Sequence, residues 1–167
     1  MLRYNSDIEP VYWLDTFNTR DEIVTATTDM EYSGSGTSTG AALEYAAVHL
    51  LNPDFGARQE ATKMTIVLTD GGSDDYIDQS AQLLRSRSNV SLENCCLLIQ
   101  PETFCHEYFQ VIAIGVTKDS NKEELSRIAS PPLSRSIYQV SDFNDLDLLT
   151  DSILDALCTV KTIEQLN

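Results

Sequence analysis

Asp70 is the polar side chain best placed for chemistry, because it directly follows the apolar run 64–68 (MTIVL). Such a run, β-branched at its centre, is typical of a strand buried on both faces of a parallel sheet. Ligands of open α/β sheets bind beyond the carboxyl ends of the strands, so an aspartate there could hold one. Gly71 and Gly72 would let the backbone turn sharply around it. Alone, Asp70 could equally be a cap for the helix expected after residues 73–75.

A second oxygen-rich segment, Thr37-Ser38-Thr39, lies in a Ser/Gly/Thr cluster just before the Ala- and Leu-rich run 41–51. That run has strong helix propensity and one apolar face. If the helix packs beside the strand, Thr37 and Asp70 meet at the same edge of the sheet. Hydroxyl and carboxylate oxygens are the ligands that Mg²⁺ or Ca²⁺ prefers, which predicts a divalent cation site. The competing interpretation makes Thr37 or Thr39 a helix N-cap.

Two other kinds of site fit the sequence poorly. The spacing Gly34-x-Gly36-x-x-x-Gly40 is similar to a dinucleotide-binding loop, but such a loop needs a buried strand directly before it, and residues 28–32 do not form one. For nucleophilic catalysis, the two histidines lack an obvious serine or cysteine partner, and no serine stands in a G-x-S-x-G turn. We therefore expect a protein that is not an enzyme.

Charge narrows the choice of partners. The chain of 167 residues carries 26 acidic and 11 basic side chains, a net charge of −15. Such a surface repels nucleic acid phosphates and anionic lipid, and favours cations or basic partners. No apolar stretch approaches the length of a bilayer span. Nucleic acid binding and membrane insertion are therefore not expected.

Strands alternate with helices after residue 60, which predicts an α/β fold: a doubly wound, mostly parallel sheet with helices on both faces. A hairpin is expected to come first. Its predicted strands are 2–4 and 11–14. The predicted later strands are 64–68, 111–116 and 137–140. The predicted helices are 21–28, one from residue 41, 76–86, 121–129 and 146–157.

Residues 90–110 break this rhythm and hold three of the four cysteines, so we interpret them as an insertion closed by a disulfide. Cys105 is predicted to pair with Cys95 or Cys96, because adjacent cysteines rarely bond to each other. An alternative is that residues 95–99 form an extra edge strand. Asn89 begins the sequon Asn-Val-Ser and is expected to carry a glycan if the chain is secreted.

The order TFNTRDEI, SGSGTSTGAALEYA, MTIVLTDGGSDD and VIAIGV resembles von Willebrand factor type A domains, the modules of matrilins, non-fibrillar collagens and integrin inserted domains. The resemblance covers the chain except residues 90–110 and the last few residues. It implies a partial domain over residues 1–158 and a tail over 159–167. It also implies a metal-ion-dependent adhesion site that takes its threonine from Thr37 and its aspartate from Asp70.

The family's remaining metal ligands come from a D-x-S-x-S loop after the opening strand, and this sequence has none. The first six residues resemble the family's second strand, so the resemblance implies that a first strand and helix are missing. It also implies weak binding of Mg²⁺ (or Ca²⁺ or Mn²⁺) by this chain. Cys158 would suit the family's domain-closing disulfide, with its mate in the missing part.

The function implied is an extracellular adhesion or matrix module, secreted or in an ectodomain, that binds an acidic side chain of a protein ligand through a bridging cation. One alternative is a non-catalytic regulatory domain within a larger enzyme or channel subunit. Another is a metal-free interaction domain.

Overall fold

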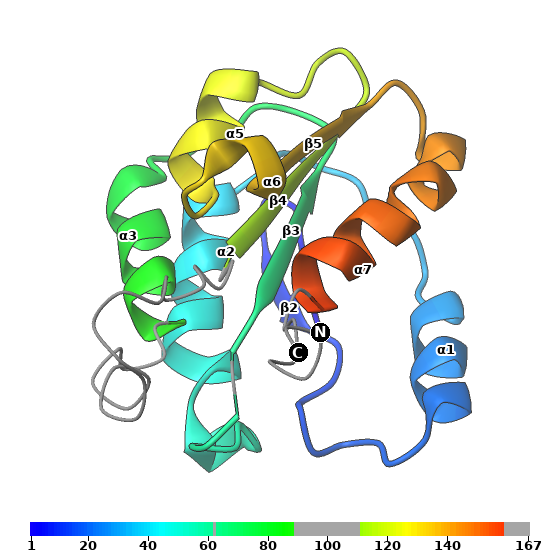
Figure 1. Cartoon of the computed structure of the whole chain (residues 1–167). Helices are drawn as coiled ribbons and strands as arrows, with labels where there is room; N and C mark the ends of the chain where they lie inside the picture. Colours follow the sequence, from blue (N-terminus) through cyan, green and yellow to red (C-terminus); the bar gives the residue numbers. More distant parts are fainter. Residues whose placement is uncertain (62, 89–110, 159–167) are drawn as a thin grey trace, which may run out of the picture.

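A parallel sheet lies at the centre of the fold, with helices on both faces (Figure 1). The computed structural model describes residues 1–61, 63–88 and 111–158. The sheet strands, in spatial order, are β3 (Thr65–Thr69), β4 (Val111–Val116) and β5 (Ile137–Val140). Both neighbouring pairs are parallel. The doubly wound α/β prediction is therefore confirmed.

β4 is the central strand, and each of its six residues is buried. Its partners are in register, with Val111 opposite Thr65 and Ala113 opposite Ile137. Alternate side chains of a strand point to opposite faces. Each face of β4 therefore contributes to its own hydrophobic cluster.

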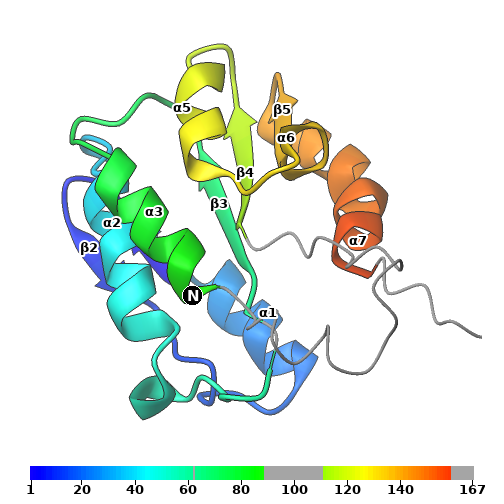
Figure 2. The ribbon, with the colours of Figure 1, turned by 60° about the vertical axis from the view of Figure 1, so that its left-hand side comes forward.

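One face of the sheet is covered by helices from three stretches of the chain (Figure 2). The helices on this face are α2 (Thr39–Tyr45), η1 (Ala46–Leu50), α3 (Asp78–Arg87) and α5 (Lys122–Ile128). Leu43, Leu84 and Leu125 bring apolar side chains from these helices against Val67 and Val111. The helix predicted from residue 41 begins slightly earlier and continues as a π-helical turn.

The opposite face is covered by η3 (Phe143–Leu149) and α7 (Thr150–Cys158). Leu149 and Ile153 pack there against Ile112, Ile114 and Val116. Leu154, which is also apolar, is 49% exposed and does not share in this packing.

The predicted hairpin forms, but its second strand was placed wrongly. β1 (Leu2–Tyr4) pairs antiparallel with β2 (Ile8–Pro10), not with residues 11–14. The turn is tight because the side chain of Asn5 accepts a hydrogen bond of 2.7 Å from the N–H of Asp7. The short turn brings residues 8–10 beside β1. The sequence did not predict this strand, because glutamate and proline are uncommon in strands.

β3 also departs from its prediction. It runs one residue later than 64–68, and it is not buried on both faces. Val67 and Thr69 are buried, whereas Ile66 and Leu68 are 49% and 41% exposed. Within the described residues β4 is the strand paired with β3, so the other edge and part of one face stay uncovered.

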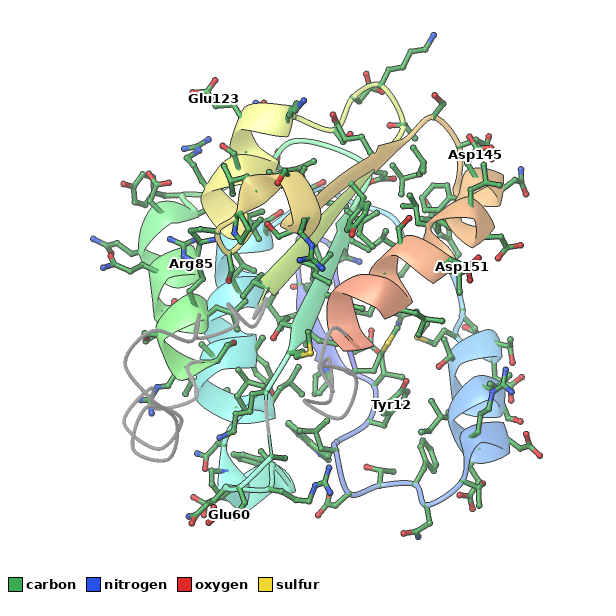
Figure 3. All side chains as sticks on the ribbon, viewed as in Figure 1. Tyr12, Glu60, Arg85, Glu123, Asp145 and Asp151 are labelled. Carbon is green, nitrogen blue, oxygen red and sulfur yellow. The ribbon has the colours of Figure 1, made fainter. Side chains whose placement is uncertain are left out.

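α1 (Arg20–Thr28) confirms the helix predicted over 21–28 and stands apart from the sheet, at the right of Figure 1. Thr19 and Glu22 form a capping box at its start. None of its residues is buried, and Figure 3 shows the side chains on its outer side pointing away from the rest of the molecule. On its inner side the hydroxyl of Thr27 lies 3.2 Å from that of Tyr12. The remaining short helices are η2 (Pro53–Phe55) and α6 (Leu133–Ser136).

Candidate cation site at the carboxyl edge of the sheet

The hairpin turn is hydrogen-bonded to the Ser/Gly/Thr loop that precedes α2. The N–H of Ser6 donates to the carbonyl of Ser35 at 2.7 Å, and the N–H of Ser38 donates to the carbonyl of Asn5 at 2.7 Å. Gly36 lies between them with a φ of +56°, a left-handed conformation that glycine adopts without strain. The loop is thus fixed along the edge of the sheet where the parallel strands end.

The same loop is bound to the segment that follows β3. The N–H of Thr37 donates to the carboxylate of Asp74 at 2.6 Å, and the N–H of Asp74 returns a bond to the carbonyl of Thr37 at 2.9 Å. The hydroxyl of Ser73 donates to that carbonyl at 3.3 Å. This paired bonding holds Thr37 beside residues 71–74.

Thr37 and Asp70 are therefore close neighbours in space. A Cβ built on Gly71, the residue after Asp70, would lie 3.9 Å from the hydroxyl oxygen of Thr37. The Asp70 side chain is exposed, and within the described residues its carboxylate takes part in no hydrogen bond or ion pair. Its backbone carbonyl accepts a bond of 2.9 Å from the hydroxyl of Thr117. The carboxylate is thus free to act as a ligand.

The donor set fits a divalent cation only in part. Thr37 offers a hydroxyl and Asp70 a carboxylate, both hard oxygen ligands. Across residues 1–61, 63–88 and 111–158, however, there is no cluster of three or more His, Cys, Asp or Glu side chains suited to a metal. Two protein ligands leave most of the coordination sphere to water, which suits weak binding.

The alternative roles as helix caps do not hold. The N-cap residue of α2 is Ser38, which makes no capping bond with its side chain, and the N-cap residue of α3 is Ile77, not Asp70. The cap of α2 comes instead from Asp75. Its carboxylate accepts bonds from the N–H groups of Gly40 at 2.7 Å and Ala41 at 2.8 Å. A residue after β3 thus secures the helix that begins next to Thr37.

These contacts shift the ionisation of Asp75. Burial by itself would raise its pKa, but hydrogen bonds from the Ser73 hydroxyl and from the N–H groups of Gly40 and Ala41 outweigh burial. The net effect is a pKa below the usual 3.8. A depressed carboxyl pKa stabilises the fold above the unfolded-state pKa, and this contribution is lost as pH falls through the folded-state pKa.

We predict that Asp75→Ala lowers the free energy of unfolding at pH 7 by about 1–2 kcal/mol, the usual effect of removing a helix cap. The difference from wild type should shrink as pH falls from the unfolded-state pKa through the lower folded-state pKa, since the carboxylate of the folded wild type becomes protonated over that range. Urea unfolding followed by circular dichroism over a pH series measures this. Asp119→Ala is the control, because Asp119 is exposed in the loop after β4. A difference that stays constant with pH would contradict the role of the charge.

Glu124 is a residue of this region that the sequence did not reveal. It is buried, and its two carboxylate oxygens accept the N–H of Ser73 at 2.9 and 3.2 Å. α5, which begins after its N-cap Asn121, therefore anchors the loop that carries Asp70. From the sequence alone, an acidic residue in a helix is expected to lie on the protein surface. Only the three-dimensional structure shows that Glu124 is buried and bound to Ser73.

Other predicted residues lie outside this site. Cys95, Cys96, Cys105 and Asn89 lie outside the described residues, as does the alternative edge strand 95–99, and of Cys158 only the backbone position at the end of α7 is described. His49 packs against aromatic rings, with its centroid 4.4 Å from that of Tyr45. The residues before the glycine loop form no strand, which agrees with the exclusion of a dinucleotide site.

The model of the von Willebrand factor type A domain matches residues 1–152. The chain belongs to the von Willebrand factor type A family. Matrilin-1 of Mus musculus is 30% identical over 158 residues, covering 95% of this chain and 27% of matrilin-1. The collagen alpha-1(XX) chain of Mus musculus is 28% identical over 158 residues, covering 95% of this chain and 10% of the collagen chain.

A solved structure supports the von Willebrand factor type A fold. Proximal thread matrix protein 1 from the mussel byssus, with a zinc-occupied metal-ion-dependent adhesion site, superposes with a TM-score of 0.76. It is 21% identical and covers 94% of this chain and 35% of the mussel chain. The similarity shows the shared fold, and the zinc belongs to the mussel protein.

The chain thus spans about a tenth to about a quarter of the length of these two relatives. The relatives are extracellular matrix proteins, so this von Willebrand factor type A domain is homologous to modules of the matrix. In the part of the chain that the structure describes, no helix is long and apolar enough to cross a membrane.

Proposed function

We propose that this domain is an extracellular adhesion or matrix-assembly module that binds a protein ligand through a divalent cation. The observation that carries the proposal is the convergence of Thr37 and the free carboxylate of Asp70 at the carboxyl edge of the sheet. Mg²⁺ uses few protein ligands and keeps several waters, which an incoming carboxylate can replace. The ligand would therefore contribute an acidic side chain.

The strong negative charge of the chain supports this choice of mechanism. With a net charge of −15, the domain repels an acidic partner unless a cation lies between the two carboxylates. A bridging Mg²⁺, Ca²⁺ or Mn²⁺ reverses the sign of the potential at that point. Binding should for this reason depend on the cation more than on the apolar area buried.

Two further parts of the proposal concern location and covalent structure. Homology to matrix proteins supports secretion or an ectodomain. In that setting Asn89 would carry a glycan and Cys105 would pair with Cys95 or Cys96, while Cys158 would close the domain. We also infer that the chain has no catalytic role, because no serine stands in a G-x-S-x-G turn and neither histidine has an obvious serine or cysteine partner for catalysis.

Adhesion to an immobilised extract of extracellular matrix tests the function. We expect the full chain to be retained in millimolar Mg²⁺, and expect EDTA or Asp70→Ala to reduce retention about tenfold or more, since either removes the bridging charge. Asp119→Ala should behave as wild type. Retention that persists in EDTA would instead favour the metal-free interaction domain.

A regulatory module of a larger enzyme or channel subunit is the alternative use of the same fold. This alternative would be favoured if the folded chain were not retained on the matrix extract either with Mg²⁺ or with EDTA.

A further inference from the structure

Tyr32 is the most exposed of the large hydrophobic side chains in the described residues, with 95% of its surface accessible. It lies between α1 and the loop that carries Thr37, in a segment, 30–34, that forms neither helix nor strand. Within the described residues its hydroxyl takes part in no hydrogen bond. The phenol is therefore accessible to a modifying enzyme without any change in the fold.

Two acidic residues precede this phenol in the same segment. Asp29 lies three positions before Tyr32, and Glu31 lies directly before it. Both are exposed, and in the part of the chain that the structure describes neither carboxylate accepts a hydrogen bond or forms an ion pair. The sequence from residue 21 to residue 57 contains no lysine or arginine. The segment thus offers unpaired negative charge beside a free hydroxyl.

Arg3 comes close to this segment in space, but its charge is already compensated. It donates one hydrogen bond to the backbone carbonyl of Glu31. Its guanidinium also forms an ion pair of 2.5 Å with the carboxylate of Glu9. The side chain of Glu31 is therefore left free, while its backbone is held in place.

Tyr76 is the matched comparison, because it is also exposed, at 67%, and also follows acidic residues. Its two preceding carboxylates are occupied, since Asp74 and Asp75 accept N–H groups of the loop before α2 and of its first turn at 2.6 and 2.7 Å. A hydrogen bond to the carboxylate of Asp78 raises the pKa of the Tyr76 phenol, which makes it a poorer nucleophile. The sequence alone would favour Tyr76, whereas the structure favours Tyr32.

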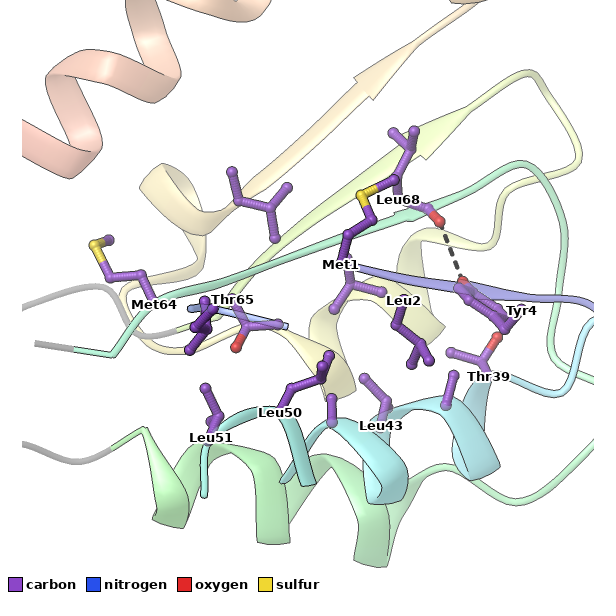
Figure 4. A pocket seen from close by; sticks show the side chains of 15 residues that line it. Met1, Leu2, Tyr4, Thr39, Leu43, Leu50, Leu51, Met64, Thr65 and Leu68 are labelled. Carbon is purple, nitrogen blue, oxygen red and sulfur yellow. Dashed lines mark hydrogen bonds between the residues drawn. The ribbon is translucent and has the colours of Figure 1, made fainter. Parts of the chain in front are cut away.

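The other described tyrosines are less accessible. Tyr45 follows a glutamate, but it lies within α2 and its ring packs against a histidine, with the ring centroids 4.4 Å apart. The hydroxyl of Tyr4 donates to the carbonyl of Leu68 at 3.1 Å (Figure 4). The hydroxyls of Tyr12 and Tyr138 are also hydrogen-bonded. None of these four tyrosines offers an exposed ring and a free hydroxyl in an irregular segment.

Transfer of a sulfuryl group is a reaction that selects such a tyrosine. The phenolic oxygen attacks the sulfur of a nucleotide phosphosulfate donor, and a new O–S bond forms as the bond from sulfur to the phosphate oxygen of the donor breaks. The phenolic proton passes to a base of the transferase, and the nucleotide phosphate leaves. Because the donor is anionic, the transferase needs a cationic site, and a cationic site attracts a tyrosine with free carboxylates beside it.

We propose that Tyr32 is O-sulfated by a tyrosine sulfotransferase of the secretory route. The proposal rests on the extracellular location proposed above and not on the cation site. The sulfate ester adds a permanent negative charge and oxygen acceptors at the surface beside the loop that carries Thr37. Such a group suits the arginine side chains of a basic partner.

Peptide mapping by mass spectrometry tests this on the full chain, secreted from mammalian cells behind a cleavable signal peptide. We expect the peptide with Tyr32 to gain the mass of one sulfo group, which phosphatase does not remove, and the peptides with Tyr45 and Tyr76 to stay unmodified. Tyr32→Phe should abolish the gain. An unmodified Tyr32, a gain that phosphatase removes, or equal modification of Tyr76 would overturn the proposal.

A rate measurement isolates the effect of the free carboxylate. A purified tyrosine sulfotransferase with an isotope-labelled phosphosulfate donor should label Glu31→Gln about tenfold more slowly than wild type, because one charge-assisted contact is lost. Glu60→Gln is the matched control, since Glu60 is also an exposed glutamate, in the loop before β3, and it should be labelled as fast as wild type. Equal rates for Glu31→Gln and wild type would show that the free carboxylate does not direct the reaction.

Because the signal peptide or the purified enzyme brings the chain and the transferase together, and no cation is bound in either assay, a negative result would leave the proposed adhesive function unaffected.

Discussion

An engineered chain with a strand, a D-x-S-x-S loop and a helix added in that order ahead of Met1 is expected to bind Mg²⁺ about tenfold or more tightly than the present chain. Ligand number and charge set the affinity of oxygen sites for divalent cations. Thr37 and Asp70 supply one hydroxyl and one carboxylate, and the added loop would supply a further carboxylate and two hydroxyls. The present chain should bind at about millimolar dissociation constants.

Isothermal titration calorimetry on both chains measures this difference. Asp70→Ala in the engineered chain should return the affinity to that of the present chain or weaker, whereas Asp119→Ala should leave it unchanged. Circular dichroism must show that each protein is folded. If the engineered chain bound no better than the present one, or if Asp70→Ala had no effect, the cation site would be wrongly placed.

Leu84→Ala should cause the largest loss of stability from a single substitution discussed for this fold. Leu84 is fully buried in α3 and lies in the cluster that joins α2, α3 and α5 to the sheet. Truncating such a side chain removes apolar burial and leaves a cavity, together about 2–5 kcal/mol. This is a large fraction of the about 5–15 kcal/mol that stabilises a typical domain.

Urea unfolding gives the free energy for wild type and variant. Leu83→Ala, one position earlier on the same helix and only partly buried, should lose clearly less. Equal losses for the two variants would mean that α3 does not present Leu84 to the core as described.

The sequence predicted those elements whose environment can be read locally. β4 is surrounded by structure on both faces, so its continuous apolar run was sufficient to place it. β3 carries the same kind of run, but the burial of Ile66 and Leu68 depends on which segments lie beside them in space. The composition of a strand indicates that its side chains are apolar enough to be buried. It does not indicate whether another segment of the protein packs against them.

The candidate site shows the same limit. The types and positions of Thr37 and Asp70 indicated a shared edge, and the hydrogen bonds around Thr37 support their proximity. The sequence assigned no role to Asp75, yet its carboxylate caps α2, accepting the N–H of Gly40, 35 residues earlier in the chain. Glu124 gave no signal at all. Contacts made through tertiary structure leave no local pattern in the sequence.

The bonds that join the loops of the site to one another connect distant parts of the chain. The contact from Ser73 to Glu124 spans 51 residues, and that from Gly40 to Asp75 spans 35. Contacts of such high sequence separation form late, because each must first close a long loop at an entropic cost. The cation-binding edge should consequently appear only when the whole domain has folded. A partly folded chain would have α2 and β3 as separate elements but would not yet present Thr37 beside Asp70.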